Sequence, residues 1–243
     1  MDSKILLISG IVAVIAISVW IAKKNENKDI KEDTIATVLD TVPDAPVAFG
    51  YKCMWFAVKT EDKDRVAKVL NLKNTKPSNW KSGIEQAYNA SVFVTPSIDG
   101  WVLVAGWGLP HGDSQESLAE VKTIAGMLSK EFDEAHFFCS HRVVEYHCWL
   151  KSVNGNTQRL YSYMGEQLQN IEIVGKPTDA EKGYDLVNTF SAEAEKDDYW
   201  DNEDLIIPDE QLVMKIAGAW SIDPTLIENN KNIKGLGLLG TLK

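Results

Sequence analysis

Cysteine, basic charge and catalytic signatures are scarce in this chain. Its 243 residues include three cysteines, too few for the disulfide framework of a small secreted domain. Cys53, Cys139 and Cys148 form no C-x-x-C pair, so we expect free thiols in a reducing compartment; one disulfide plus a free thiol is the alternative. The formal net charge is -10 and no basic stripe occurs, which argues against nucleic-acid binding.

Several motif classes are missing as well. The sequence contains no P-loop, serine-hydrolase or protein-kinase signature and no internal repeat. Gly235, Gly237 and Gly240 have the spacing of a dinucleotide fingerprint, but no strand is expected before them and three residues remain for the helix. The acidic segment 193–204 lacks the turn glycine and terminal glutamate of an EF-hand loop. We predict no cofactor.

The most apolar segment lies at the N-terminus. Residues 5–22 are almost continuously apolar, and 18 helical residues span roughly 27 Å, enough for a bilayer core. A cleaved signal peptide is the alternative, but no small-residue cleavage site precedes Lys23. We therefore predict a single-pass transmembrane anchor over residues 1–24. Lysines 23, 24 and 28 follow the segment whereas Lys4 alone precedes it, which favours a globular body on the cytoplasmic side.

The remainder of the chain divides into a tether, a folded body and a tail. Residues 25–48 are charged with mixed signs and predict a tether. An apolar fraction of 44% and eight tryptophans indicate a folded globular domain, expected over residues 49–228. Glycine-rich residues 229–243 predict a flexible tail.

Strands and helices alternate through the predicted domain. Aromatic and β-branched runs predict strands over residues 49–59, 91–96, 101–107, 136–153 and 171–174. Apolar residues three or four apart, with capping residues before them, predict helices over 61–72, 79–89, 113–132, 178–188 and 208–221. The turn pairs Asp99-Gly100 and Asn154-Gly155 favour hairpins. The fold class is α+β, with helices packed on a mixed or antiparallel sheet.

The strand over 136–153 carries the candidate chemistry. On a straight strand, Cys139, His141, Glu145 and His147 share one face, because side chains alternate. His141 and His147 would then lie roughly 20 Å apart, too far for one metal ion. A metal triad of His141, Glu145 and His147 requires a bend at Val143-Val144. Without the bend, Cys139 pairs with His141 as a possible activated thiol, and Glu145 pairs with His147 as a possible base.

Structural roles compete with each of these functional roles. Cys139 suits a small buried apolar position, and Glu145 with His147 suits a hydrogen-bonded pair within the sheet. Arg142 is expected to bind a carboxylate or to line a groove beside Tyr161 and Tyr163. His111 lies in a loop, where functional residues are common. We favour the structural roles and predict no catalytic or metal-binding residue.

Three segments resemble a group of uncharacterised bacterial proteins. They are His141-Arg-Val-Val-Glu-Tyr-His147-x-Trp149, Arg159-x-Tyr-x-Tyr163-x-Gly-Glu166 and Ala219-Trp-Ser-Ile-Asp-Pro224. The resemblance covers most of residues 49–228 and implies neither an activity nor site residues. The sequence thus favours a membrane-anchored, non-catalytic module, accessory or protective, that binds another protein. The alternative is a metal- or thiol-dependent hydrolase that uses residues 139–149.

Overall fold

The structure is a computed structural model that describes residues 39–230, 233 and 235–242. The predicted anchor and most of the predicted tether lie outside these residues. Among the residues described, no helix is both long and apolar enough to cross a bilayer. The anchor over residues 5–22 therefore stays a prediction.

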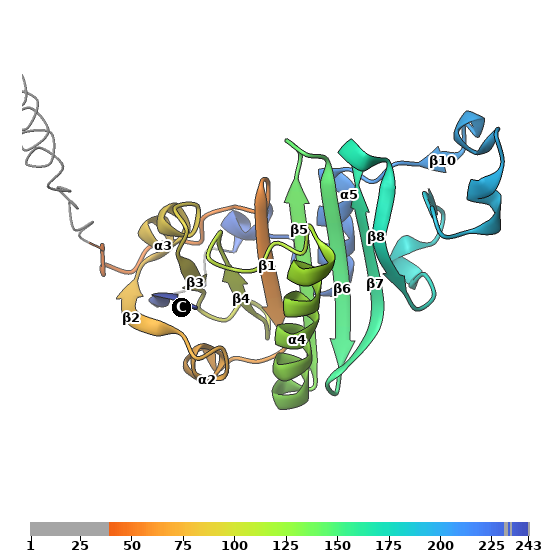
Figure 1. Ribbon diagram of the computed structural model, residues 1–243. Coiled ribbons are helices and arrows are strands. Elements are labelled where there is room, and N and C mark those ends of the chain that lie inside the picture. The colour runs from red at the N-terminus through yellow and green to blue at the C-terminus, as the bar shows by residue number, and fades with distance from the viewer. Residues whose placement is uncertain (1–38, 231–232, 234, 243) are drawn as a thin grey trace, which may run out of the picture. The chain divides into compact units, whose positions relative to one another are not determined.

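A nine-stranded sheet forms the centre of the described domain (Figure 1). Its strands lie in the order β2-β11-β3-β4-β1-β5-β6-β7-β8, and every neighbouring pair is antiparallel. The α+β class with an antiparallel sheet is thus confirmed. The strands are β1 (Cys53–Val58), β2 (Lys73–Ser78), β3 (Val92–Val94), β4 (Val102–Ala105), β5 (Glu134–His141), β6 (Tyr146–Val153), β7 (Asn156–Met164), β8 (Gln169–Val174) and β11 (Gly237–Thr241).

Helices cover both faces of this sheet. α2 (Lys63–Val69) and α4 (Gln115–Phe132) bury their apolar side chains against one face, which we call the α4 face. α3 (Trp80–Ala87) and α5 (Glu210–Trp220) pack on the other, the α5 face. Figure 1 shows α4 crossing in front of the sheet and α5 behind it. The central strands are buried on both faces, so few of their side chains reach solvent.

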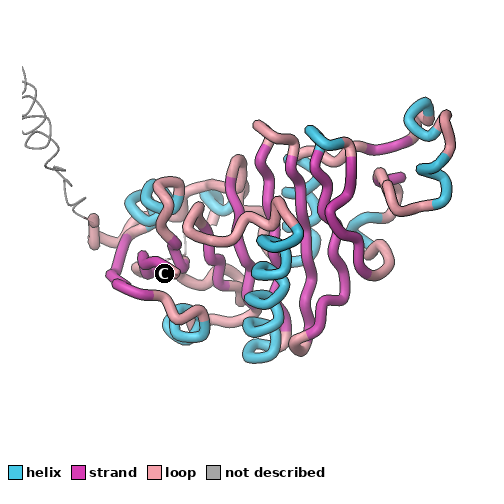
Figure 2. Tube along the Cα trace, viewed as in Figure 1, coloured by secondary structure: helices cyan, strands magenta, loops and turns pink. Residues whose placement is uncertain are grey.

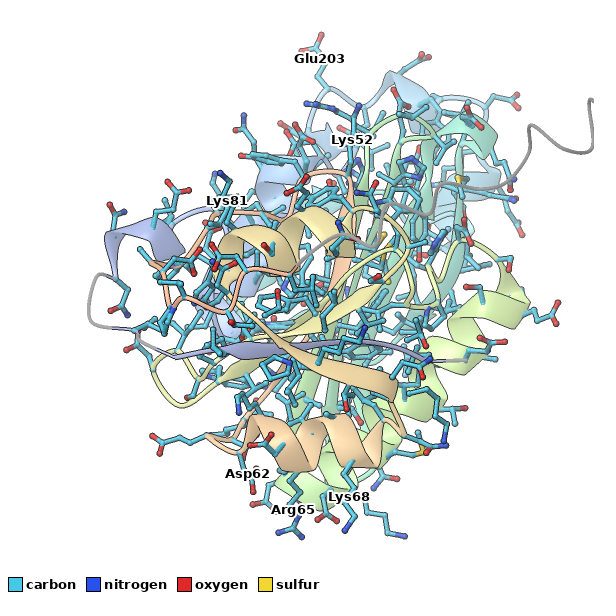
Figure 3. All side chains as sticks on the ribbon, turned by 90° about the vertical axis from the view of Figure 1, so that its left-hand side faces the viewer. Lys52, Asp62, Arg65, Lys68, Lys81 and Glu203 are labelled. Atoms are coloured by element: carbon cyan, nitrogen blue, oxygen red, sulfur yellow. The ribbon has the colours of Figure 1, made fainter. Side chains whose placement is uncertain are left out.

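Local capping explains where the helices begin. The side chains of Asp62, Asn79, Ser114 and Asp209 each accept a hydrogen bond from a backbone amide of the first helical turn. These bonds satisfy amides that lack an intrahelical partner. Val66 and Ala67 of α2 are buried, whereas Asp62, Arg65 and Lys68 point into solvent (Figure 3). The four α-helices of the described domain therefore begin close to their predicted starts.

Short elements connect β8 to α5. Thr178 and Glu181 form the predicted capping box, but the helix stops after one 3-10 turn, η2 (Asp179–Glu181). A small parallel pair, β9 (Asp185–Leu186) with β10 (Leu205–Ile206), brackets the acidic segment. That segment holds η3 (Ala192–Glu195) and η4 (Tyr199–Asp201). The predicted helix over 178–188 is wrong beyond its first turn.

The prediction of a flexible C-terminal tail is wrong for Gly237–Thr241. These residues form β11, which hydrogen-bonds to β2 on one side and to β3 on the other. Side chains at Gly237 or at Gly83 of α3 would collide with the ring of Phe93, so the ring occupies the space that both glycines leave. A glycine-rich strand has low intrinsic strand propensity, which is why the sequence pattern did not reveal it.

Two further segments differ from expectation. Strand β2 was not predicted; it lies at the sheet edge, and its two lysines and Pro77 are typical of edge strands that resist pairing with another chain. The last residues of the predicted tether lie against the domain: the Asp44 carboxylate accepts hydrogen bonds from the amides of Trp80 (2.7 Å) and Lys81 (3.0 Å). Residues 39–48 therefore pack on the start of α3.

Candidate functional site

The stretch from Cys139 to Trp149 is not one strand but two. β5 ends at His141, the chain reverses over residues 142–145, and β6 runs back beside β5 (Figure 2). The bend that a metal triad requires is therefore present at Val143-Val144. A hydrogen bond stabilises this turn: the amide of Val144 donates to the carbonyl of His141 at 3.3 Å.

The Asn154-Gly155 turn joins β6 to β7 as predicted. Both residues have positive φ, 50° and 81°, as a two-residue hairpin turn requires. Without a bulge, this two-residue turn would place Trp149 opposite Leu160 and His147 opposite Ser162. A bulge between Lys151 and Ser152 shifts the register by one residue, so Trp149 faces Tyr161. The shift matters for the site because it places His147 opposite Tyr163 rather than Ser162.

Cys139 and Cys148 are direct partners across β5 and β6 on the α4 face. Both thiols are free and completely buried. Burial raises the pKa of Cys148 to about 12 and that of Cys139 well above its ordinary value. A thiol acts as a nucleophile through its thiolate, so this environment disfavours the activated-thiol hypothesis.

The two histidines of the hypothetical triad point away from each other. His147 lies on β6 between Tyr146 and Cys148, both of which face α4, so its ring faces α5. His141 follows the alternation of Cys139 and faces the α4 side. Within the described residues, no group of three or more His, Cys, Asp or Glu side chains could hold a metal ion. The bend thus occurs without creating a metal centre.

Glu145 belongs to the turn rather than to the strand. It is exposed with φ of 50°, and its carbonyl accepts a hydrogen bond from the amide of Gly165 at 3.0 Å. No hydrogen bond joins its carboxylate to His147, so the expected Glu145–His147 pair is wrong. Arg142 does bind a carboxylate, since its guanidinium contacts Glu210 of α5 at 3.2 Å.

A row of buried polar side chains crosses the α5 face. Ser140, His147 and Tyr163 occupy consecutive register positions on β5, β6 and β7. Ser140 Oγ, His147 Nδ1 and Tyr163 Oη have no hydrogen-bond partner in the described part of the chain. Burial lowers the pKa of His147 to about 4; Asp209 opposes the shift and His141 adds to it. His147 is therefore neutral at physiological pH.

A second polar group on the α5 face is completely paired. The buried guanidinium of Arg159 contacts the Glu181 carboxylate through Nε (2.9 Å) and NH2 (2.6 Å). Trp149 and Thr178 donate further hydrogen bonds to the same carboxylate. Burial raises the pKa of Glu181, but the bonds from Arg159, Thr178 and Trp149 outweigh it and hold the pKa below its ordinary value. This network fastens η2 to β6 and β7.

Trp107 gathers two histidines that are far apart in sequence. The rings of His111 and His141 meet its indole edge-on, at centroid distances of 4.9 and 5.1 Å. Trp107 Nε1 donates to the carbonyl of Lys52 at 3.0 Å. Burial lowers the pKa of His141, and the nearby His111 lowers it further. This contact could not be predicted from the sequence, because residues 107, 111 and 141 belong to separate segments that only the fold brings together.

Exposed apolar side chains lie at the end of the sheet where β5 turns into β6. We define the strand-end rim by Tyr51, Trp107, His141, Val143 and Leu168. Tyr51, Val143 and Leu168 are 43%, 63% and 56% exposed. The loop before β1, which carries Tyr51, lies beside the 142–145 turn because β1 pairs with β5. The same turn lies beside the 165–168 loop because Gly165 hydrogen-bonds to Glu145. Lys52, labelled in Figure 3, lies at this end, and Figure 1 shows the 142–145 turn beside η1 (Gly165–Gln167).

No protein-family model, curated protein or solved structure matches the chain.

Proposed function

We propose that the domain is a non-catalytic protein-interaction module, accessory or protective in role, whose partner docks on the strand-end rim. The main support for this proposal is that Tyr51, Val143 and Leu168 are exposed on three neighbouring loops. Large apolar side chains are costly to leave in water, and clusters of them are typical of recognition surfaces. The indole of Trp107 beside them is of the aromatic kind that protein interfaces favour.

The surroundings of the rim favour a protein over a nucleic acid. The chain carries a net charge of -10, which would repel phosphates. Glu145 and Glu166 add exposed carboxylates beside the apolar residues, and Lys52 adds an ammonium group. Such a mixture of apolar, aromatic and charged groups supports docking of a folded partner with a complementary patch.

In this proposal residues 5–22 hold the module at a membrane, with the domain on the cytoplasmic side. The support comes from the length and apolarity of that segment and from the lysines that follow it. The hydrolase alternative gains no support from the buried thiols or from the opposed histidines.

Co-purification of the full-length chain in mild detergent tests the proposal. We expect a stoichiometric partner with the wild type and at least a tenfold loss with Val143→Asp or Leu168→Asp. Met127→Asp is the matched control, because Met127 is 44% exposed but lies on α4, roughly 18 Å along the helix from its first residue. No partner with the wild type, or equal loss in all three variants, would contradict rim docking.

A further inference from the structure

α5 covers a buried histidine at each of its ends. Near its first turn, His147 is 4% exposed and faces Asp209, the N-cap residue. Near its last residue, the buried ring of His136 lies 5.4 Å from that of Trp220. Both imidazoles have an Nδ1 atom without a hydrogen-bond partner in the described structure.

The two ends of α5 differ in how they can accommodate a proton. His136 Nε2 donates to the Glu134 carboxylate at 3.0 Å, and Glu134 also contacts Lys59 and Lys151. A carboxylate is thus in place to stabilise a protonated His136. His147 has no such hydrogen bond to any described residue, and its cross-strand neighbours Ser140 and Tyr163 are neutral.

The charged groups around His147 define what protonation would disturb. On α5, the Asp209 carboxylate already caps the Leu212 amide at 2.8 Å, and Glu210 is bound to Arg142 of the β5–β6 turn. On β5, His141 opposes a further positive charge. Among the described residues, Asp209 is the carboxylate that acts on His147, and it is already engaged; the second oxygen of Glu210, also buried on α5, makes no hydrogen bond to the ring. A charge on His147 would therefore be buried without a free carboxylate to pair with it.

We infer that α5 is an acid-sensitive cover: protonation of His147 releases the N-terminal half of α5 from the sheet, while the Trp220 end and the α4 face stay folded. Release gives the imidazolium access to water and breaks the Arg142–Glu210 contact. The lowered pKa of His147 agrees with a trigger between about pH 6.5 and pH 4.

Hydrogen exchange of the full-length chain at pH 7 and pH 5 tests this inference. After correction for intrinsic rates, we expect protection of the amides of residues 213–217 to fall about tenfold or more at pH 5, while α4 amides change little. The His147→Gln variant, neutral at both values, should lose this difference. Equal loss of protection in α4 and α5, or an unchanged α5, would overturn the inference.

The native thiols give a second readout on the unmodified chain. Cys53 lies on the α5 face, beside Ser140 in the ladder, whereas Cys139 and Cys148 lie on the α4 face. Labelling with 4,4′-dithiodipyridine, followed by mass spectrometry, should show Cys53 reacting at least tenfold faster relative to the other two at pH 5 than at pH 7. Simultaneous labelling of all three cysteines would indicate global unfolding and contradict local release.

Discussion

His141 and His147 lie on opposite faces of the main sheet, although the chain reverses direction between them. Reversal over residues 142–145 shortens their separation but does not turn their side chains toward each other. Alternation along each strand fixes the face of a residue once its neighbours are placed. His147 pairs with Ser140, whose side chain points to the face opposite that of His141. The ligand triad considered from the sequence therefore fails because the two histidines face opposite sides of the sheet, not because they are too far apart along the chain.

The opposed histidines predict that zinc will not stabilise the domain through them. Thermal unfolding of the wild type with equimolar Zn²⁺ should give the same Tm as unfolding with a chelator, because two ligands on opposite faces cannot share an ion. The variants His141→Ala and His147→Ala serve as controls. A zinc-dependent rise in Tm that disappears in each variant would show that both side chains bind one ion.

A pH-dependent stability is expected from His147. Its folded-state pKa of about 4 lies below the unfolded value of about 6.5, so in this window the unfolded chain binds a proton that the folded chain does not. The contribution of neutral His147 to the free energy of unfolding is fully present above pH 6.5. It falls by on the order of 2–3 kcal/mol as the pH drops to 4. Urea unfolding of wild type and His147→Gln at pH 7, 5 and 4 measures the difference. Parallel pH profiles for the two proteins would exclude His147 as its source.

The buried Arg159–Glu181 pair predicts a large and local stability effect. Glu181→Gln leaves the guanidinium without its counter-charge, which costs roughly 3–5 kcal/mol when a buried pair is broken. The neighbouring Asp179–Lys182 pair is exposed, so Asp179→Asn is the matched control and should leave stability unchanged. Chemical denaturation compares the two. Similar midpoints for both variants would mean that the buried network contributes little.

The contact of Phe93 with Gly237 predicts that β11 tolerates no side chain there. Gly237→Ala should destabilise the domain by about 1–3 kcal/mol, because the new methyl group collides with the buried ring. Combining it with Phe93→Leu should cost less than the sum of the two single changes, since the smaller side chain removes the clash with the ring and leaves only the clash with the Val94 carbonyl. Additive losses in denaturant unfolding would indicate that the two residues do not compete for space.

Structure set by a few neighbouring residues could be predicted from the sequence, whereas structure set by distant contacts could not. Capping residues such as Asn79 and Asp209, and the Asn154-Gly155 turn, act over a few residues, and their helices and hairpin were predicted correctly. β11 was missed because its pairing with β2 and β3 joins segments more than 140 residues apart. Its glycines leave room for groups on those distant segments: Gly237 for the Phe93 ring and the Val94 carbonyl, and Gly240 for the Lys73 carbonyl. Long-range packing of this kind leaves no local signal.

The sequence singled out residues 139–149, but it did not predict how their side chains are arranged. The 139–149 stretch does lie at a loop-rich end of the sheet. The tight turn at residues 142–145 and the bulge near Lys151 decided which side chains face α4 and which face α5. Trp107, which brings His111 next to His141, could be recognised only once β4 and β5 were placed on either side of β1.

Site-specific photo-crosslinking from the rim tests rim docking most directly. A photoreactive amino acid at Val143 of the full-length chain, expressed in cells, should capture one protein reproducibly, and the same residue at Met127 on α4 should not. Both positions are exposed, so reagent access is comparable. Capture of a single protein from Val143 alone is the result we predict. Absence of any crosslink from Val143, or the same crosslinks from Met127, would contradict the assignment of the strand-end rim as a protein-binding surface.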